Sequence, residues 1–334
     1  MAARQSAPVL GALCSRTEHR ASSSTTALPD PPRRRPWTIS VGYRFQPSSR
    51  HFVGTVEQKQ RELLHNQIQN VYHLFDVSVS RMITRRWTVN ASLPVLLAHR
   101  NQLYVPRGEF RVRSIGDATV GARAWLFRPP TESGANIGLG FNLKLPTGKY
   151  NAMGLARDRS GNVIFATADQ SIQAGDGGTG FSVDIQAYRP FYGGTTLYFS
   201  GTYLFNPRNT NGVSTFRTRR GEEVMSVADQ YLARGGVSRA LPKFRNITVT
   251  FGGRIEGVPV RDLIGASDGF RRPGYAISLD PGFMVAFRGS VFSCNVPFAV
   301  ERNRRRSVTD IANGTHGDAA FADYALILGF SRNF

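Results

Sequence analysis

The sequence lacks any long apolar run. None of its 334 residues belongs to a stretch approaching the ~20 consecutive apolar residues that a membrane-spanning helix needs. This absence excludes a helical membrane protein. A membrane β-barrel remains possible, because barrel strands alternate apolar and polar residues and average near neutral hydropathy, and the mean hydropathy here is −0.26.

Cysteine and catalytic motifs are also scarce. The two cysteines, Cys14 and Cys294, are far apart and in no metal-ligand spacing, so neither a disulfide framework nor a zinc site is expected. The six histidines include no pair with metal-ligand spacing on a helix, and the sequence has neither a phosphate loop nor a nucleophile elbow. We therefore expect no catalytic residues, no metal and no cofactor.

Acidic residues are few compared with basic ones. The chain has 42 Lys and Arg against 23 Asp and Glu, a net charge of +19. Such a charge suggests a nucleic-acid partner, but the arginines are spread along the whole chain and form no DNA- or RNA-binding motif. We therefore expect no nucleic acid. A basic barrel would instead meet anionic lipopolysaccharide at its rim, or draw anionic solutes into its mouth.

Period-two alternation of apolar residues is the strongest positive signal. It recurs in twelve stretches, at 37–45, 71–79, 87–95, 118–126, 137–145, 181–187, 197–205, 227–237, 247–255, 275–287, 292–300 and 324–334. The links between these stretches are alternately short and long. The long ones cover 47–67, 99–115, 146–177, 206–225, 258–273 and 302–319.

Outer-membrane barrels have short periplasmic turns and long external loops. The alternation therefore predicts an all-β fold for residues 37–334: a transmembrane antiparallel up-and-down β-barrel of about twelve strands. Both termini fall at the end of the barrel where the links are short. Because short turns are periplasmic, both termini are predicted to be periplasmic.

The last stretch carries a second signal. Tyr324, Leu326, Leu328, Phe330 and Phe334 fall at alternate positions, and the chain stops on Phe334. This is typical of the closing strand and sorting signal of a bacterial outer-membrane barrel. We therefore expect location in the bacterial outer membrane, contact with its lipid and lipopolysaccharide, and recognition of Phe334 by the barrel-assembly machinery.

The same alternation assigns the charged residues of the strands to the lumen. A charge facing lipid would cost ~2–4 kcal/mol at the bilayer midplane, whereas an inward mixture of both signs can pair and hold water. The predicted lumen-lining residues are Arg44, Asp76, Asp117, Arg123, Lys144, Asp184, Arg234, Arg254, Glu256, Asp280, Glu301 and Asp323.

Residues 1–36 do not follow the strand pattern. They are rich in Ser, Thr, Pro and Arg, a composition typical of disorder. The segment Ala7 to Cys14 is a poor core for a secretory signal, because it is short and broken by Pro8 and Gly11. We expect a disordered or processed tail, with either a degenerate export signal or a start upstream of Met1.

Three segments outside the strands are candidates for a role. Segment 56–70 is rich in helix formers, so it predicts a short helix that either lies on the surface or plugs the mouth. Loop 146–177 is a second candidate constriction. The run Arg302, Arg304, Arg305 and Arg306 predicts either a solvated loop or a contact for lipopolysaccharide phosphates, which arginine binds bidentately.

Two short stretches resemble a known family. Ser114 to Arg123 opens a strand with Gly116-Asp117, and Gly138 to Tyr150 ends a strand with Leu-Pro-Thr-Gly. Together they resemble the outer-membrane family named for the meta-pathway of phenol degradation. The resemblance implies an envelope barrel that passes small, often aromatic or apolar, compounds. For Asp117 itself, bonds to loop backbone N–H groups or to an arginine such as Arg123 are favoured over substrate contact.

These observations predict passive passage of small molecules through a narrow lumen. One alternative is a closed structural or adhesion barrel whose loops carry the function. A lipase-like outer-membrane enzyme is a further, disfavoured alternative, because no His is followed by Ser two residues later. The solute and the oligomeric state remain open.

Overall fold

The computed structural model describes residues 36–129 and 131–334. Its main sheet contains fifteen strands: β1 (Trp37–Ser48), β4 (Gln69–Met82), β5 (Trp87–Gln102), β6 (Gly108–Ile115), β7 (Thr119–Trp125), β8 (Asn136–Lys144), β11 (Gly180–Pro190), β12 (Thr195–Phe205), β15 (Gln230–Ala240), β16 (Ile247–Val258), β17 (Gly274–Leu279), β18 (Gly282–Phe287), β19 (Ser290–Asn295), β20 (Phe298–Arg304) and β22 (Leu326–Asn333). Three pairs, β6–β7, β17–β18 and β19–β20, are each one barrel strand interrupted part-way. The fifteen therefore form a barrel of twelve.

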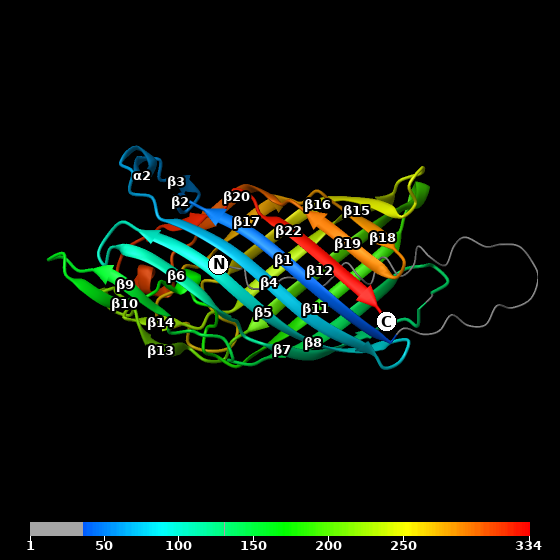
Figure 1. Ribbon diagram of the computed structural model, residues 1–334, viewed down its shortest axis with the longest axis horizontal. Coiled ribbons are helices and arrows are strands. Elements are labelled where there is room, and N and C mark those ends of the chain that lie inside the picture. Colours follow the sequence, from blue (N-terminus) through cyan, green and yellow to red (C-terminus); the bar gives the residue numbers. More distant parts are fainter. Residues whose placement is uncertain (1–35, 130) are drawn as a thin grey trace, which may run out of the picture.

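The barrel closes on itself (Figure 1). All ladders of the main sheet are antiparallel, and β22 returns to pair with β1 from Thr38–Asn333 to Phe45–Leu326. The N–H of Phe334 donates to the carbonyl of Trp37 at 2.9 Å. The predicted twelve-stranded antiparallel barrel is confirmed, and its first and last strands meet at the end where the short turns lie.

Two of the strand interruptions coincide with proline. Pro281 separates β17 from β18, and Pro297 separates β19 from β20. Proline has no N–H to donate to a ladder, so it removes a ladder hydrogen bond and favours an interruption at these two positions. The barrel wall continues on both sides of each break.

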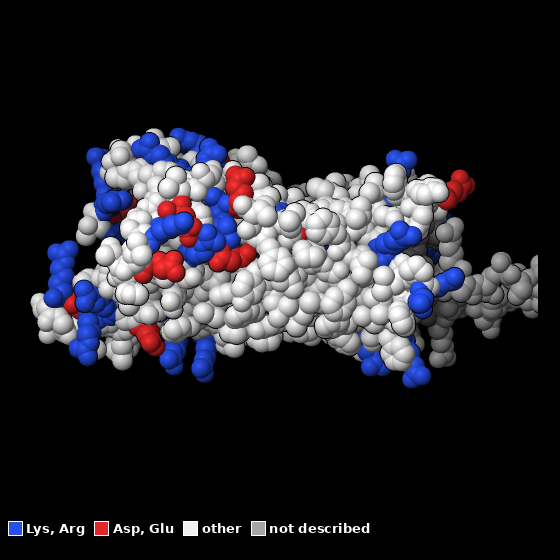
Figure 2. Space-filling model, turned by 90° about the horizontal axis from the view of Figure 1, so that it is seen from above, with Lys and Arg blue, Asp and Glu red and all other residues white. Residues whose placement is uncertain are grey.

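An apolar belt surrounds the middle of the barrel. Outward residues such as Val41, Val77, Leu139, Phe141 and Val183 are exposed, while their sequence neighbours face inward. On the face seen in Figure 2, this belt is a band with almost no charged residues, and charged residues gather at the two ends. The alternation is therefore inverted relative to a soluble protein, with apolar residues outside.

The prediction of a long link over 99–115 was wrong. β5 continues to Gln102 and β6 begins at Gly108, so just five residues connect them. Here Phe110 and Val112 are buried, while Arg111 and Arg113 are exposed. In this part of the ladder the inward face is apolar and the outward face is charged, the reverse of the other strands. The pattern used for the other strands therefore did not reveal β6.

Smaller elements cover the long-loop end. β2 (Arg50–Val53), β3 (Val56–Glu57) and β21 (Ala319–Phe321) form a three-stranded sheet next to helix α2 (Gln60–Leu63). β9 (Met153–Arg157) pairs with β10 (Val163–Thr167), and β13 (Thr210–Ser214) pairs with β14 (Val224–Ser226). η2 (Gln170–Ile172) and α3 (Val308–Ala312) also belong to this end, whereas η3 (Tyr192–Gly194) forms the short turn between β11 and β12 at the opposite end.

None of the helices in the described residues is both long and apolar enough to cross a membrane. The predicted tail at 1–36 lies, except for Pro36, outside the described residues.

Candidate functional site

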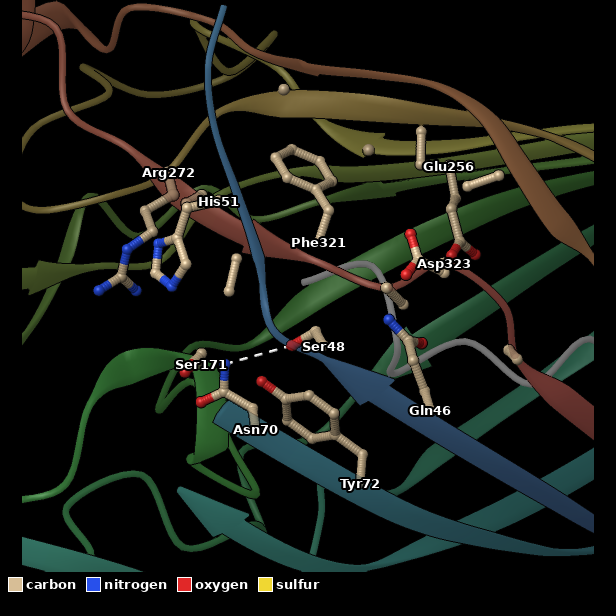
Figure 3. A pocket seen from close by; sticks show the side chains of 18 of the residues that line it. Gln46, Ser48, His51, Asn70, Tyr72, Ser171, Glu256, Arg272, Phe321 and Asp323 are labelled. Atoms are coloured by element: carbon tan, nitrogen blue, oxygen red, sulfur yellow. Dashed lines mark hydrogen bonds between the residues drawn. The ribbon is translucent and has the colours of Figure 1, made fainter. Parts of the chain in front are cut away.

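Polar side chains line the inner wall toward the long-loop end of the barrel. On β1, the alternate residues Arg44, Gln46 and Ser48 are buried. On the neighbouring strand β4, Asn70 pairs in register with Ser48, and its side-chain amide donates to the Ser48 hydroxyl at 3.2 Å (Figure 3). Alternation along two paired strands thus presents a continuous polar surface to the lumen.

A carboxylate joins two arginines at the base of this surface. Glu256, on β16, accepts hydrogen bonds from both terminal nitrogens of Arg44 on β1. It also accepts from Arg254, with Nη2 at 2.7 Å from Oε2. β1 and β16 are not neighbouring strands, so the contact crosses the lumen and narrows it.

A cavity of about 90 Å³ lies above this bridge. Its lining includes aromatic rings from Tyr72, Tyr104 and Phe321 beside the charged groups of Arg100 and Arg272. Figure 3 shows the side chains of Tyr72, Phe321 and Arg272 around the space. The site can therefore offer both ring faces and hydrogen-bond donors to one small molecule.

Loop 146–177 enters the barrel at this level and is held there by Asp169. Both carboxylate oxygens of Asp169 accept from Arg272, at 2.7 and 2.6 Å. Arg100 of β5 lies 3.5 Å away on another side. Burial acts to raise the pKa of Asp169, but the charges of Arg100 and Arg272 outweigh it and hold that pKa well below its usual value. Asp169 is thus ionised, and it links this loop to Arg100 on the wall and to Arg272 in the loop that precedes β17.

Apolar packing supports the same element. Ile172, in η2, is fully buried in a cluster with Leu74 of β4, Leu96 of β5 and Phe110 of β6. Gln173 fixes the next turn by donating to the carbonyls of Ala152 and Ala168. The part of the loop from Ala168 to Ala174 is therefore packed in the barrel interior.

The inward loop separates two cavities. Ser171 and Arg272 line both the first cavity and a second one of about 50 Å³. The second is also bordered by Gln173 and Asp176. The Asp169–Arg272 contact accordingly lies at a constriction between two spaces within the barrel.

The two stretches that suggested the family resemblance meet in space. Asp117 accepts from the backbone N–H groups of Gly148 (2.9 Å) and Asp176 (3.1 Å). Thr147 donates to the carbonyl of Gly116 at 3.0 Å. A Cβ at Gly148 would lie 2.7 Å from the Gly116 backbone, so no other residue fits there without movement. The structural role expected for Asp117, through loop N–H groups, is confirmed.

Ion pairs continue along the lumen toward the short-turn end. Lys144 donates to Asp176 and lies 3.9 Å from Asp117. The distance from Arg123 to Asp184 is 4.0 Å, and that from Arg234 to Asp280 is 3.1 Å. Both signs are therefore paired along the wall.

The structure places the residues predicted to line the lumen as follows. Six are buried in the barrel: Arg44, Asp117, Lys144, Arg234, Arg254 and Asp280. Asp76, Arg123, Asp184 and Glu256 are partly buried on the same inward positions of their strands, and Asp323 lies at the mouth, where it bonds Arg50 and Arg302.

Glu301 is the exception and corrects the prediction. The ladder between β17 and β20 shifts by one residue between Ile277 and Ser278, so Glu301 pairs with Ile277 and is exposed. Its carboxylate accepts from the hydroxyl of Tyr275 at 2.7 Å. A one-residue bulge moves a side chain to the opposite face, which simple alternation cannot anticipate.

The arginine run at 302–306, predicted to be either a solvated loop or a contact for lipopolysaccharide phosphates, is only partly exposed. Arg302 and Arg304 are buried and bond the carboxylates of Asp323 and Asp310. Arg305 and Arg306 are exposed. Because Arg302 and Arg304 of β20 are held in ion pairs and only Arg305 and Arg306, beyond the strand, are exposed, four arginines are not available together for a phosphate.

The helix expected in segment 56–70 forms as α2, and it lies on the surface. Leu63 is 79% exposed, so the helix does not plug the mouth. Its anchor is Arg61, which bonds Asp318 at 2.6 Å beside His51. Burial acts to raise the pKa of Asp318, but the His51 hydrogen bond and the Arg61 charge lower it to about 2.

Sequence reasoning missed the groups that form the constriction. Arg100 lies beyond the alternating core assigned to β5, and Asp169 and Arg272 lie in loops. The one available signal was the density of polar residues around Asp169 and Gln170 in a long loop. Among the described residues, no group of three or more potential ligands could hold a metal.

The sequence matches no family model and no curated protein sequence. Among solved structures, the barrel resembles an outer membrane channel from Pseudomonas putida F1, with 12% identity, a TM-score of 0.60 and coverage of 92% of this chain and 97% of that one. It also resembles the β domain of the Bordetella autotransporter BrkA, with 12% identity, a TM-score of 0.50 and coverage of 90% and 100%. At this identity the likeness shows the fold alone, and that fold is the bacterial outer-membrane β-barrel.

Proposed function

We propose that this chain is a bacterial outer-membrane channel for the passive passage of small molecules. The observation that carries the proposal is the polar lumen with a loop-built constriction: Asp169 and Arg272 separate two cavities inside a closed barrel. A lumen lined by paired charges and amides holds water, and the two cavities give small solutes a space within it.

The solute class follows from the lining of the first cavity. Tyr72, Tyr104 and Phe321 offer ring contacts, while the side chains of Gln46 and Asn70 offer amide groups for hydrogen bonding. The preferred solute is a small molecule that combines an aromatic ring with a hydroxyl or carboxyl group. The resemblance to the family named for phenol degradation supports the same class, and assignment to that family is part of this proposal.

The proposal includes an orientation and its partners. The short-turn end, with Trp37 and Phe334, faces the periplasm, and the long-loop end faces lipopolysaccharide. The barrel-assembly machinery recognises Phe334. The inward residues named above, apart from Glu301, line the solute path.

Reconstitution of the full chain tests the channel. In planar bilayers we expect discrete conductance steps, and liposomes that contain the protein should swell in benzoate faster than empty liposomes. A barrel with heat-modifiable gel mobility that neither conducts nor swells would instead be a closed structural barrel. Recovery of the native protein from the cytosol would overturn the membrane location.

A further inference from the structure

The short-turn end of the barrel carries basic residues almost without acidic ones. Its turns and the adjoining strand ends hold ten exposed basic side chains: Arg81, Arg85, Arg86, Arg128, Arg189, Arg239, Lys243, Arg245, Arg288 and Arg332. In the described part of the same region, a single residue, Glu132, is acidic. We call the ten residues the basic ring.

The basic ring lacks counterions from the chain itself. Within the described residues, none of the ten forms a salt bridge, although arginines at the other end do, as in the partly buried Arg61–Asp318 and the exposed Arg111–Glu109. Figure 2 shows both signs mixed at the long-loop end and mainly basic residues at the other. The charge of the ring therefore has to be balanced from outside.

Exposed aromatic rings occupy the same end. They are Trp37, Trp87, Phe127, Phe191, Tyr192, Phe244, Phe287 and Phe334. Three guanidinium groups lie against such rings: Arg81 at 5.1 Å from Trp37, Arg288 at 5.0 Å from Phe287 and Arg332 at 5.3 Å from Phe334. Aromatic residues of membrane proteins concentrate at headgroup level, so these contacts hold the arginines at the depth of lipid phosphates.

We propose that the basic ring binds anionic phospholipid headgroups in the membrane leaflet at the short-turn end. This inference rests on the membrane location proposed above. Arginine binds phosphate oxygens bidentately, and clusters of basic side chains attract anionic lipid. The ring has members on all five short turns and on β22. A leaflet surrounds the barrel on every side, whereas an acidic protein partner would need one concentrated patch.

Two tryptophans allow a direct test, since Trp37 and Trp87 are exposed at strand ends on this side, whereas Trp125 packs beside Tyr188 on the inward face. The full chain is reconstituted into phosphatidylcholine vesicles with increasing brominated phosphatidylglycerol, which quenches nearby tryptophans. Brominated phosphatidylcholine serves as the reference lipid. We expect an apparent preference for phosphatidylglycerol of about five-fold at low salt, falling toward one at 0.5 M NaCl because salt screens exposed charge.

A sixfold variant removes much of the ring: R85Q, R86Q, R128Q, R189Q, K243Q and R245Q. The preference of this variant for phosphatidylglycerol over phosphatidylcholine should fall to less than two-fold. The matched control neutralises six exposed basic residues at the long-loop end, K59Q, R107Q, R113Q, R159Q, R220Q and R261Q, and should keep the preference of the natural chain.

Each outcome is decisive. Equal quenching by both lipids, or an unchanged preference in the ring variant, would overturn the lipid proposal; capture of an acidic periplasmic protein by the ring would then identify the other class of partner. Conductance is recorded on the same vesicles, so a conducting barrel without lipid preference refutes this inference alone. Absence of quenching by either lipid would refute the membrane location.

Discussion

A single carboxylate, Asp169, connects the inward loop to one strand of the wall and to a second loop. Arg272 is 103 positions away in sequence, and Arg100 belongs to a strand. All three side chains are buried. Loss of one partner from such a group leaves buried charge uncompensated, which costs ~3–5 kcal/mol.

Asp169→Asn should therefore loosen the loop. With two cationic groups left close together, we expect η2 to leave the constriction, and single-channel conductance or open probability to rise at least two-fold. The control is Asp158→Asn, the same change in the same loop, where the carboxylate bonds Ser160 and Asn162 in an exposed turn. Equal conductance for the natural chain and both variants would show that Asp169 does not gate the lumen.

At the scale of elements, Asp318 holds together two of the small elements that cover the long-loop end, β2 and α2. It precedes β21 and bonds His51 on β2 and Arg61 on α2. Its pKa is about 2 in the folded chain, below the unfolded value of ~3.9. The stabilisation is therefore complete above about pH 4 and is lost as the pH falls toward 2, by ~1–2 kcal/mol.

Limited proteolysis can follow this change. The segment 50–66 should become more susceptible to pepsin between pH 4 and pH 2, while the transmembrane ladder stays intact. Asp318→Asn should make the segment equally susceptible across that range. A pH profile that is the same in the variant and in the natural chain would assign the effect to other groups.

At the scale of the whole molecule, closure depends on the pairing of β1 with β22. The last residue contributes a backbone bond to Trp37, but its ring is 52% exposed. The side chain therefore adds little to packing, and its exposed ring is accessible to the assembly machinery proposed above to recognise it.

Phe334→Ala should separate the two roles. We expect the heat-modifiable, assembled fraction in cells to fall about five-fold, while the purified variant refolds in detergent with unchanged yield. Phe287→Ala is the control, since that ring is similarly exposed at the same end. A similar loss of refolding in detergent would mean that Phe334 acts through stability instead.

The sequence by itself determined the barrel. Lipid on one side and a polar lumen on the other require alternation along every strand, so twelve stretches, the inward position of residues such as Arg44 and Lys144, and the meeting of the ends could be predicted. Tertiary structure alone decided the rest. The Glu301 bulge, the extension into β6 and the joining of Asp169 to Arg100 and Arg272 depend on register and loop packing between distant segments, and these interactions leave no period in the chain.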